Sequence, residues 1–350
     1  MGPLCVSDYE ALAASKLEPG AFGYFAGGAN DEQTLRENVE AYGRWHLRPR
    51  VLRDVASPST ATTVLGRAVS MPLLVAPVAY QRAAHPDGEI GMARAALAAG
   101  TIMCLSTLAT CSPADVVATG ADCWFQLYVP HDKGAARDLC RQAGELGFRA
   151  LVVTVDLPVS GRRERDLRSG FSVPPELTVP SIGRGGLKPH EFVELMSPSV
   201  TWDDIDAFAG EARLPVVLKG ILTAEDARLA CEHGADAIVV SNHGGRQLDG
   251  VPATVDVLPE IVEAVDGRLE VLVDGGIRRG TDVVKAVALG ARAVLAGRAP
   301  LWGLAGAGEQ GARHVLELLR AEFELALQLC GCRTPADLTR AHVSRVPGRG

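Results

Sequence analysis

The chain has 350 residues, of which 47% are hydrophobic and only 5% aromatic, and its formal net charge is −7 at pH 7. This length and apolar content allow a large core, and the acidic balance argues against broad electrostatic binding to nucleic acid or to an anionic membrane surface. The eight cysteines form no Cys-x-x-Cys pair, so we expect a reduced cytoplasmic protein with no metal site and no disulfide framework.

Residues 1–70 precede the first clear strand, and their pattern favours an N-terminal helical extension. Ser7 is a predicted N-cap of one helix, and Asn30 or Asp31 is a predicted N-cap of a second helix over residues 34–42. This part of the chain lacks the apolar core of a secretory signal. No stretch reaches the length of about 20 apolar residues that a membrane span needs, so we expect no membrane association.

From residue 73 onward, short apolar runs alternate with helical patterns. The eight predicted strands cover residues 73–76, 103–106, 124–127, 150–155, 216–219, 237–241, 270–274 and 293–296. The predicted helices, each of which ends close to a glycine, cover residues 88–99, 133–146, 224–233, 255–265 and 281–289.

Strict alternation of strands and helices builds a parallel sheet, and eight such units close it into a barrel. We therefore predict an α/β fold, a parallel (β/α)8 TIM barrel that occupies residues 1–350 as a single domain. An open, doubly wound sheet is the alternative, but no Gly-x-Gly-x-x-Gly motif follows the first strand.

Residues 157–200, after the fourth strand, form an unusually long connection that is rich in Pro, Gly and Ser. Connections of this length inside a barrel are either functional or disordered. We expect a lid over the active site, with a disordered excursion as the alternative.

The sixth predicted strand runs directly into Ser-Asn-His-Gly-Gly-Arg, residues 241–246. Active sites of parallel barrels lie at the carboxyl ends of the strands. The imidazole of His243 can move a proton near neutral pH, and the guanidinium of Arg246 can bind a carboxylate through two hydrogen bonds. The motif indicates proton removal from a small anion, with a polar loop of turn-forming glycines as the alternative. Asp156, after the fourth strand, either orients His243 or caps the loop that follows.

Two glycine–arginine loops follow the last two strands: Asp-Gly-Gly-Ile-Arg at residues 274–278 and Gly-Arg at residues 297–298. Backbone N–H groups at glycines and at helix N-termini bind phosphate, and Arg278 and Arg298 add positive charge. The loops therefore predict a phosphate site. Lys219, at the end of the fifth strand, is a Schiff-base nucleophile, a fixed charge or a solvated lysine at the rim.

These motifs give the chain a resemblance to the FMN-dependent 2-hydroxy acid oxidases, especially glycolate oxidase, with features of hydroxymandelate oxidases. The resemblance extends from about residue 9 to residue 342. Besides the loops above, it rests on Phe-Ala-Gly-Gly-Ala-Asn-Asp at 25–31, Ala-Pro-Val-Ala at 76–79, Trp-Phe-Gln-Leu-Tyr at 124–128, Thr-Val-Asp at 154–156, Gly-Arg-Arg at 161–163 and Leu-Lys-Gly at 218–220.

The resemblance implies FMN as the cofactor, a small L-2-hydroxy acid as the substrate, O2 as the acceptor that becomes H2O2, and a homotetramer. It implies that His243 is the base, supported by Asp156, and that its proton comes from either the α-carbon or the hydroxyl. The residues implied to bind substrate are Tyr24, Tyr80, Leu108, Tyr128, Arg163 and Arg246. The residues implied to bind FMN are Pro77, Val78, Ala79, Ser106, Gln126, Thr154, Lys219, Ser241, Asp274, Gly275, Gly276, Arg278, Gly297 and Arg298.

The sequence departs from the glycolate oxidases at Leu108, where those enzymes usually have Trp, and at Tyr80, which hydroxymandelate-type enzymes share. The smaller Leu108 predicts that the pocket accepts a substrate side chain larger than hydrogen. Three alternatives stay open: the same chemistry with a quinone as acceptor, a non-redox Schiff-base enzyme that uses Lys219, and a flavin-binding relative without turnover.

Overall fold

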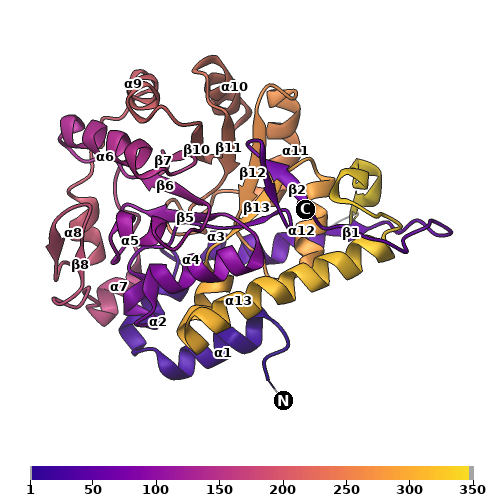
Figure 1. Ribbon diagram of the computed structural model, residues 1–350, viewed down its shortest axis with the longest axis horizontal. Helices are drawn as coiled ribbons and strands as arrows, with labels where there is room; N and C mark the ends of the chain where they lie inside the picture. Colours follow the sequence, from indigo (N-terminus) through magenta and orange to yellow (C-terminus); the bar gives the residue numbers. More distant parts are fainter. Residues whose placement is uncertain (1, 347–350) are drawn as a thin grey trace.

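Eight short buried strands form a closed parallel barrel in the computed structural model, which describes residues 2–346 (Figure 1). The strands are β4 (Leu73–Val75), β5 (Met103–Ser106), β6 (Cys123–Leu127), β7 (Leu151–Thr154), β10 (Val216–Ile221), β11 (Ala237–Val240), β12 (Glu270–Asp274) and β13 (Ala293–Ala296). Consecutive strands pair in parallel, and β13 pairs with β4 to close the barrel. The predicted (β/α)8 barrel is confirmed.

The barrel strands are apolar along their whole length because both of their faces are covered. One alternating set of side chains forms a separate cluster, which includes Leu74, Trp124, Val239 and Leu295, and the other set packs beneath the helices. The antiparallel hairpin of β2 (Thr62–Val64) and β3 (Arg67–Val69) adds Val64 and Val69 to the first cluster. The hairpin therefore closes the amino-terminal end of the barrel, which leaves the opposite end open for a site.

Helices surround the barrel. The predicted ones are α4 (Gly88–Ala99), α6 (Lys133–Leu146), α10 (Ala224–Glu232), α11 (Thr254–Val265) and α12 (Gly280–Ala288). The ones that the sequence reading missed are α5 (Pro113–Val117), α9 (Trp202–Ala212) and α13 (Arg298–Leu329). Helix α13 is kinked at Ala307 and Gly308, which leave the helical region of φ/ψ space.

The N-terminal helices are α1 (Val6–Lys16), α2 (Pro19–Ala26) and α3 (Gln33–Glu40), and α1 packs against α13 (Figure 1). The predicted caps are wrong, since Cys5 precedes α1 and Glu32 precedes α3, and neither makes a side-chain cap. The backbone N–H of Thr34 instead donates to the carboxylate of Asp249 at 2.7 Å. The cap of α3 is supplied from the loop after β11, far away in sequence.

Residues 157–200 contain α7 (Glu164–Ser169), β8 (Thr178–Val179), β9 (Arg184–Gly185) and α8 (Pro189–Val193). Helix α7 contacts α2, and the two lie on the same side of the molecule (Figure 1). Near its end the segment is attached to the loop after β6, because Ser197 N donates to Val129 O at 2.7 Å.

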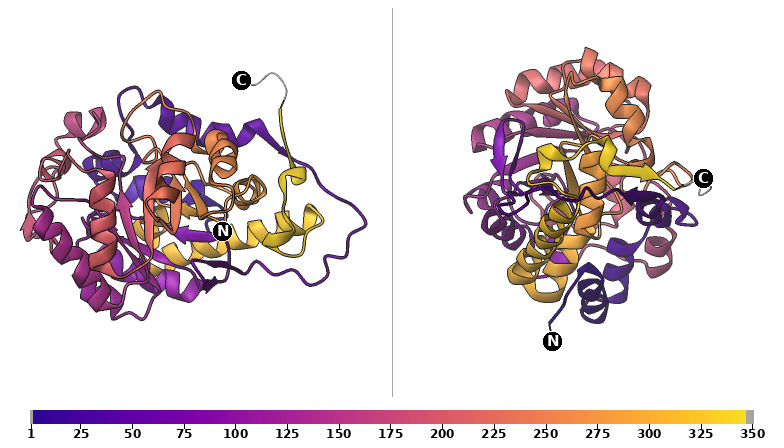
Figure 2. Two further views of the ribbon diagram at one scale, coloured as in Figure 1. Left: turned by 90° about the horizontal axis from the view of Figure 1, so that it is seen from above. Right: turned by 90° about the vertical axis from the view of Figure 1, so that its right-hand side faces the viewer.

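A second excursion lies between β1 (Trp45–Leu47), which pairs with β14 (Val343–Arg345), and β2. Figure 2 shows this stretch extending away from the barrel, and Val51 and Leu52 on it are strongly exposed. Among residues 2–346, no helix has both the length and the apolar character needed to cross a bilayer.

Candidate active site

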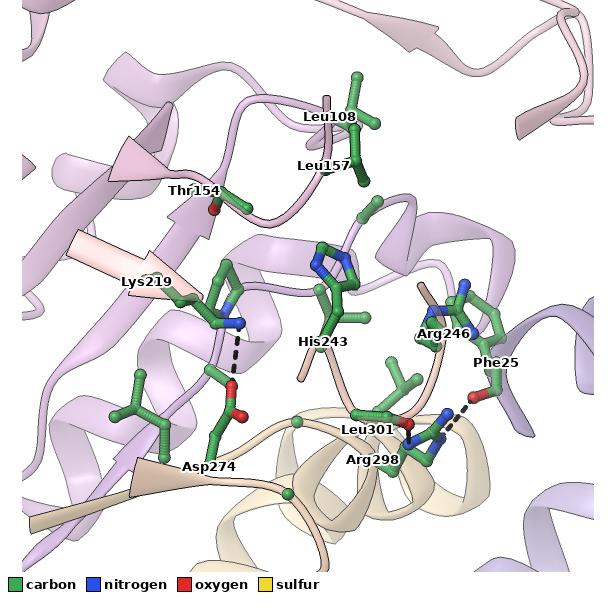
Figure 3. Close-up of a pocket in the computed structure, with 18 of the residues that line it drawn as sticks. Phe25, Leu108, Thr154, Leu157, Lys219, His243, Arg246, Asp274, Arg298 and Leu301 are labelled. Atoms are coloured by element: carbon green, nitrogen blue, oxygen red, sulfur yellow. Dashed lines mark hydrogen bonds and ion pairs between the residues drawn. The ribbon is translucent and has the colours of Figure 1, made fainter. Parts of the chain in front are cut away.

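A cavity opens at the carboxyl ends of the barrel strands (Figure 3). The predicted residues that line it are Tyr24, Pro77, Val78, Ala79, Tyr80, Leu108, Tyr128, Thr154, Arg163, Lys219, His243, Arg246, Asp274, Gly275, Gly276, Arg278, Gly297 and Arg298. Four other predicted residues, Ser106, Gln126, Asp156 and Ser241, do not line the cavity themselves. Ser106, Asp156 and Ser241 each form a hydrogen bond with a lining residue, and Gln126 accepts a hydrogen bond from Ser106.

His243 and Asp156 form a buried pair at the centre of the site. The imidazole Nδ1 lies 2.8 Å from Asp156 Oδ1, and the two side chains are only 14% and 12% exposed. Burial lowers the pKa of His243 and outweighs the opposing effect of Asp156. Burial would raise the pKa of Asp156, but His243 and Lys219 lower it, so the carboxyl is ionised. A neutral imidazole that donates from Nδ1 keeps a lone pair on Nε2, so His243 can accept a proton there.

The loop after β11 directs this lone pair toward the cavity. His243 itself has a φ of 58°, a left-handed conformation that costs free energy in a residue with a side chain, and its N–H donates to Ser241 Oγ at 3.1 Å. The hydroxyl of Tyr128 lies 3.3 Å from Nε2, where it can donate to the lone pair. A ligand hydroxyl placed beside this pair, in the cavity, would contact both groups.

Arg163 and Arg246 form a cationic wall beside this base. Arg246 Nη1 donates to Tyr24 O at 2.6 Å, and its guanidinium carbon lies 4.8 Å from the centroid of the Tyr24 ring. Arg163 Nε donates to Arg246 O at 3.2 Å, and both burial and Arg246 lower the pKa of Arg163. Two partly desolvated guanidinium groups next to a base suit an anionic substrate such as a carboxylate.

Lys219 is held as a permanent cation. Its Nζ lies 2.9 Å from Asp274 Oδ2 and donates to Ser241 Oγ, also at 2.9 Å. Burial alone would lower the pKa of Lys219, but Asp274 and Asp156 raise it above the ordinary value. A Schiff-base nucleophile needs a neutral amine, so this geometry argues against the aldolase-type alternative and favours the fixed charge.

The loops after β12 and β13 form a cradle for an anion. Gly276 has a φ of +80°, and a Cβ there would lie 1.8 Å from Asn38 O, so only glycine fits. Arg298 donates to the carbonyls of Phe25 at 2.9 Å, Gly27 at 2.8 Å and Gly244 at 3.0 Å, rather than to a carboxylate. Burial, together with the charges of Arg246 and Arg278, lowers the pKa of Arg298 well below its ordinary value. A bound phosphate would therefore stabilise these buried cations.

Two of the buried polar atoms without a partner in the described part of the chain lie on barrel strands: Asp274 Oδ1 on β12 and Gln126 Nε2 on β6. The first accepts and the second donates, so a ligand with hydroxyl groups and a polar ring edge would satisfy both. FMN has a phosphate, a ribityl chain with hydroxyls and a ring with carbonyl and imide groups. The anion cradle, Lys219 and these two atoms fit it.

The sequence did not predict these lining residues: Phe25, Ala76, Leu157, Pro189, Val193, Met196, Gly244, Leu295, Ala296 and Leu301. Pro189, Val193 and Met196 come from the long connection after β7, which has no motif to mark them. Leu157 lines the cavity as Leu108 does, and Figure 3 shows both leucines on the opposite side of His243 from Arg298. Another missed residue is Asp166 of α7, whose pKa burial raises although Arg246 and Arg163 act in the opposite direction.

Glu89 of α4 is a missed residue that organises the wall of the cavity. Its buried carboxylate accepts from Gln81 N at 3.0 Å, Thr110 N at 2.9 Å and Cys111 N at 3.1 Å. It therefore ties the loop after β4 to the loop after β5. These loops carry the two lining residues singled out from the sequence, Tyr80 and Leu108, and Tyr80 N donates to Leu108 O at 3.0 Å.

Comparisons with known proteins agree with this geometry. The model of the FMN-dependent dehydrogenase family matches residues 13–345. Human 2-hydroxyacid oxidase 1 is 46% identical, over 98% of this chain and 97% of its own length. L-lactate oxidase of Nostoc sp. is 48% identical over 96% of each chain. The solved structure of a mandelate oxidase mutant with (S)-mandelic acid has a TM-score of 0.93 and 44% identity, with 99% of both chains covered.

Proposed function

The chain belongs to the FMN-dependent dehydrogenase family, and from this we propose that its barrel oxidises a small L-2-hydroxy acid with His243 as the base. It is a flavoprotein oxidoreductase that converts a 2-hydroxy acid to the 2-keto acid, and O2 accepts the two electrons and becomes H2O2. When bound, FMN supplies the two-electron acceptor for oxidation of the substrate. The observation that carries the proposed role of His243 is the buried pair that it forms with Asp156, beside two arginines.

Substrate binding begins with the carboxylate. The paired charges of Arg246 and Arg163 attract it, and the planar guanidinium of Arg246 can form two parallel hydrogen bonds with it. The hydroxyl of Tyr24, on the ring beneath Arg246, is the proposed third contact. With the carboxylate fixed there, the 2-hydroxyl group lies near the pair formed by Tyr128 and His243.

His243 then accepts a proton at Nε2, from either the α-carbon or the 2-hydroxyl group of the substrate, and becomes an imidazolium. This new positive charge develops near Lys219, Arg163 and Arg246, whose positive charges destabilise the imidazolium. The carboxylate of Asp156, 2.8 Å from Nδ1, stabilises the imidazolium and keeps the ring oriented. Lys219 contributes a fixed positive charge to the cofactor's part of the cavity, and so favours a ligand that becomes more negative on reduction.

The remaining proposals concern the whole chain. We propose a cytoplasmic homotetramer built of one domain over residues 1–350, in which residues 157–200 form a lid. The predicted helical extension over residues 1–70 is helical as far as Arg44, and residues 45–69 hold β1, β2 and β3 instead. The lid is supported by Pro189 and Val193, which reach the cavity from α8. A reducing compartment is supported by the eight cysteines, all of which are free thiols.

The proposal is tested first with His243→Ala. We expect the variant to bind FMN but to lose reduction of the flavin by substrate by about 10²–10⁴-fold or more, because the base is gone. The measurement is anaerobic bleaching with glycolate, lactate, a medium-chain 2-hydroxy acid and mandelate. His46→Ala, which removes an exposed imidazole on β1, is the matched control. Bleaching of the His243→Ala variant at the parent rate would remove His243 from the base role.

The electron acceptor is tested separately in air. One H2O2 should form for each keto acid produced. Keto acid without peroxide, produced only with an added quinone, would show that the acceptor is not O2.

A further inference from the structure

A second cavity, with a volume of about 420 Å³, lies next to the active site. It lies over the carboxyl ends of β6, β7 and β10, and residues 196–202 together with the start of α9 cover it. Its apolar lining includes Val129, Val155, Val200, Trp202, Ile205 and Ile221. The acidic residue at its edge, Asp226, accepts from Thr223 Oγ1 at 3.0 Å as part of the N-cap of α10. The steps described above for proton removal make no use of this space.

Only side chains separate the two cavities. Leu157, Met196, Tyr128 and Thr154 line both of them. Leu157 is 7% exposed and Met196 4% exposed, so each fills the space between the cavities instead of facing solvent. A substrate held at Arg246 and His243 occupies the first cavity, and Leu157 lines that cavity as well as the second one.

The backbone behind this wall is fixed, whereas its side chains can move. Ser197 N donates to Val129 O at 2.7 Å, and His131 N donates to Leu195 O at 3.0 Å. These bonds attach the chain on both sides of Met196 to the loop after β6. Methionine is unbranched and flexible, so rotation of Met196 and Leu157 can open the wall without movement of the loop.

We propose that the second cavity binds the distal hydrocarbon part of longer aliphatic 2-hydroxy acids, with Leu157 and Met196 as the gate. This inference rests on the proposed function, because the acid end of the substrate must be held at Arg246 and Arg163. Burial of each additional methylene group in an apolar site is worth a factor of about four in binding. Selectivity for chain length should therefore depend on the second cavity, and turnover of short acids should not.

The experiment compares lactate with 2-hydroxyoctanoate on the FMN-loaded enzyme. Val200→Phe, which fills the second cavity, should lower kcat/KM for 2-hydroxyoctanoate about tenfold or more and leave kcat/KM for lactate within about twofold. Ile205→Trp fills the same cavity from α9 and serves as an independent variant if Val200→Phe folds poorly. Leu157→Ala, which opens the gate, should raise the ratio of the two kcat/KM values, and adding Val200→Phe should remove that gain.

Several results would overturn the inference. One is that Val200→Phe and Ile205→Trp lower kcat/KM equally for both substrates, or change it for neither. Another is that they slow only reoxidation of the reduced flavin by O2, which would make the cavity a gas channel. Failure of the proposed function looks different: neither acid would bleach the flavin of the parent enzyme under anaerobic conditions.

Discussion

The state of His243 results from two opposing influences on one imidazole. Burial lowers its pKa, and Asp156 acts in the opposite direction. The net direction keeps the ring neutral at neutral pH, as a base requires, while the carboxylate is ready to stabilise the charge that forms on proton transfer. At Lys219 the balance is the opposite: burial lowers its pKa, but the carboxylates of Asp274 and Asp156 raise the pKa by more and keep the amine charged.

This balance predicts the pH dependence of flavin reduction. Because burial holds the pKa of His243 below its ordinary value, kcat/KM should hold as pH falls into the acidic range and decline only as pH drops through the lowered pKa. Asp156→Asn removes an influence that raises this pKa, so the acid limb should move to lower pH and the rate should fall by about 10²–10⁴-fold. Anaerobic stopped-flow reduction between pH 4.5 and pH 8 measures both effects.

The matched control is Asp206→Asn, which removes the carboxylate 3.3 Å from the imidazole of His233 on the surface. It should leave the acid limb where it is. An acid limb that stays in place in Asp156→Asn would show that another group controls the titration.

The sequence predicted the polar residues of the site well, because His243, Lys219 and Asp274 lie at strand ends or directly after them, and strand ends in a barrel converge. It did not predict Leu157 or Met196. Both are apolar residues in a long connection, where no periodicity or motif distinguishes a lining residue from a core residue. Glu89 was missed because a glutamate in the first turn of a helix usually faces solvent, whereas this one is fully buried beneath two loops.

At the scale of elements, side chains from distant parts of the sequence fix the loops around the site. Asp249 caps α3 from the loop after β11, which explains why the capping residues predicted for α3 are not used. Glu89 similarly connects the loops after β4 and β5. The geometry of the pocket wall therefore depends on α4 as well as on the strands that carry the lining residues.

Glu89→Gln tests this connection. An amide presents N–H donors where backbone N–H groups of Gln81, Thr110 and Cys111 already converge, so at least one buried donor loses its acceptor, at a cost of about 1–3 kcal/mol. The melting temperature should fall, and KM should rise more than kcat falls as the loops that carry Tyr80 and Leu108 lose their common anchor. Thermal unfolding and steady-state kinetics with lactate and mandelate measure these effects.

Glu309→Gln is the control, because the side chain of this glutamate forms a long, exposed ion pair with Arg94 of α4, at 3.8 Å. It should change neither quantity. If Glu89→Gln lowers the melting temperature but leaves KM for both substrates unchanged, Glu89 stabilises the fold without shaping the pocket.

At the scale of the whole molecule, the barrel topology brings five cationic side chains to one end of a chain whose net charge is negative: Arg163, Lys219, Arg246, Arg278 and Arg298. The topology was predictable because the eight buried strands are short apolar runs separated by helices. Helix α13, which packs on α1, was not predicted, since it has a kink at Ala307 and Gly308 and starts at Arg298, within the loop proposed to bind phosphate. Arg298 therefore both begins α13 and lines the cavity.

Concentrating buried cations in this way predicts a strong dependence of stability on FMN. The arginines of the cradle repel one another, and a bound phosphate relieves both the repulsion and the desolvation. Saturating FMN at about 100 times its Kd stabilises the folded state by about 2.7 kcal/mol, so removal of FMN should lower Tm by roughly 5 °C. Calorimetry of the apoprotein, before and after FMN is restored, measures this shift.

Riboflavin, which lacks the phosphate, isolates the contribution of the cradle. At equal concentration it should raise Tm of the apoprotein less than FMN does, because it leaves Arg278 and Arg298 without an anion. In Arg298→Ala the difference in Tm between the FMN and riboflavin complexes should shrink. Lys285→Ala should preserve this difference, because Lys285 lies on the outer helix α12 and donates to Tyr42 O. Equal stabilisation of the parent apoprotein by FMN and riboflavin would show that the loops after β12 and β13 do not hold the phosphate.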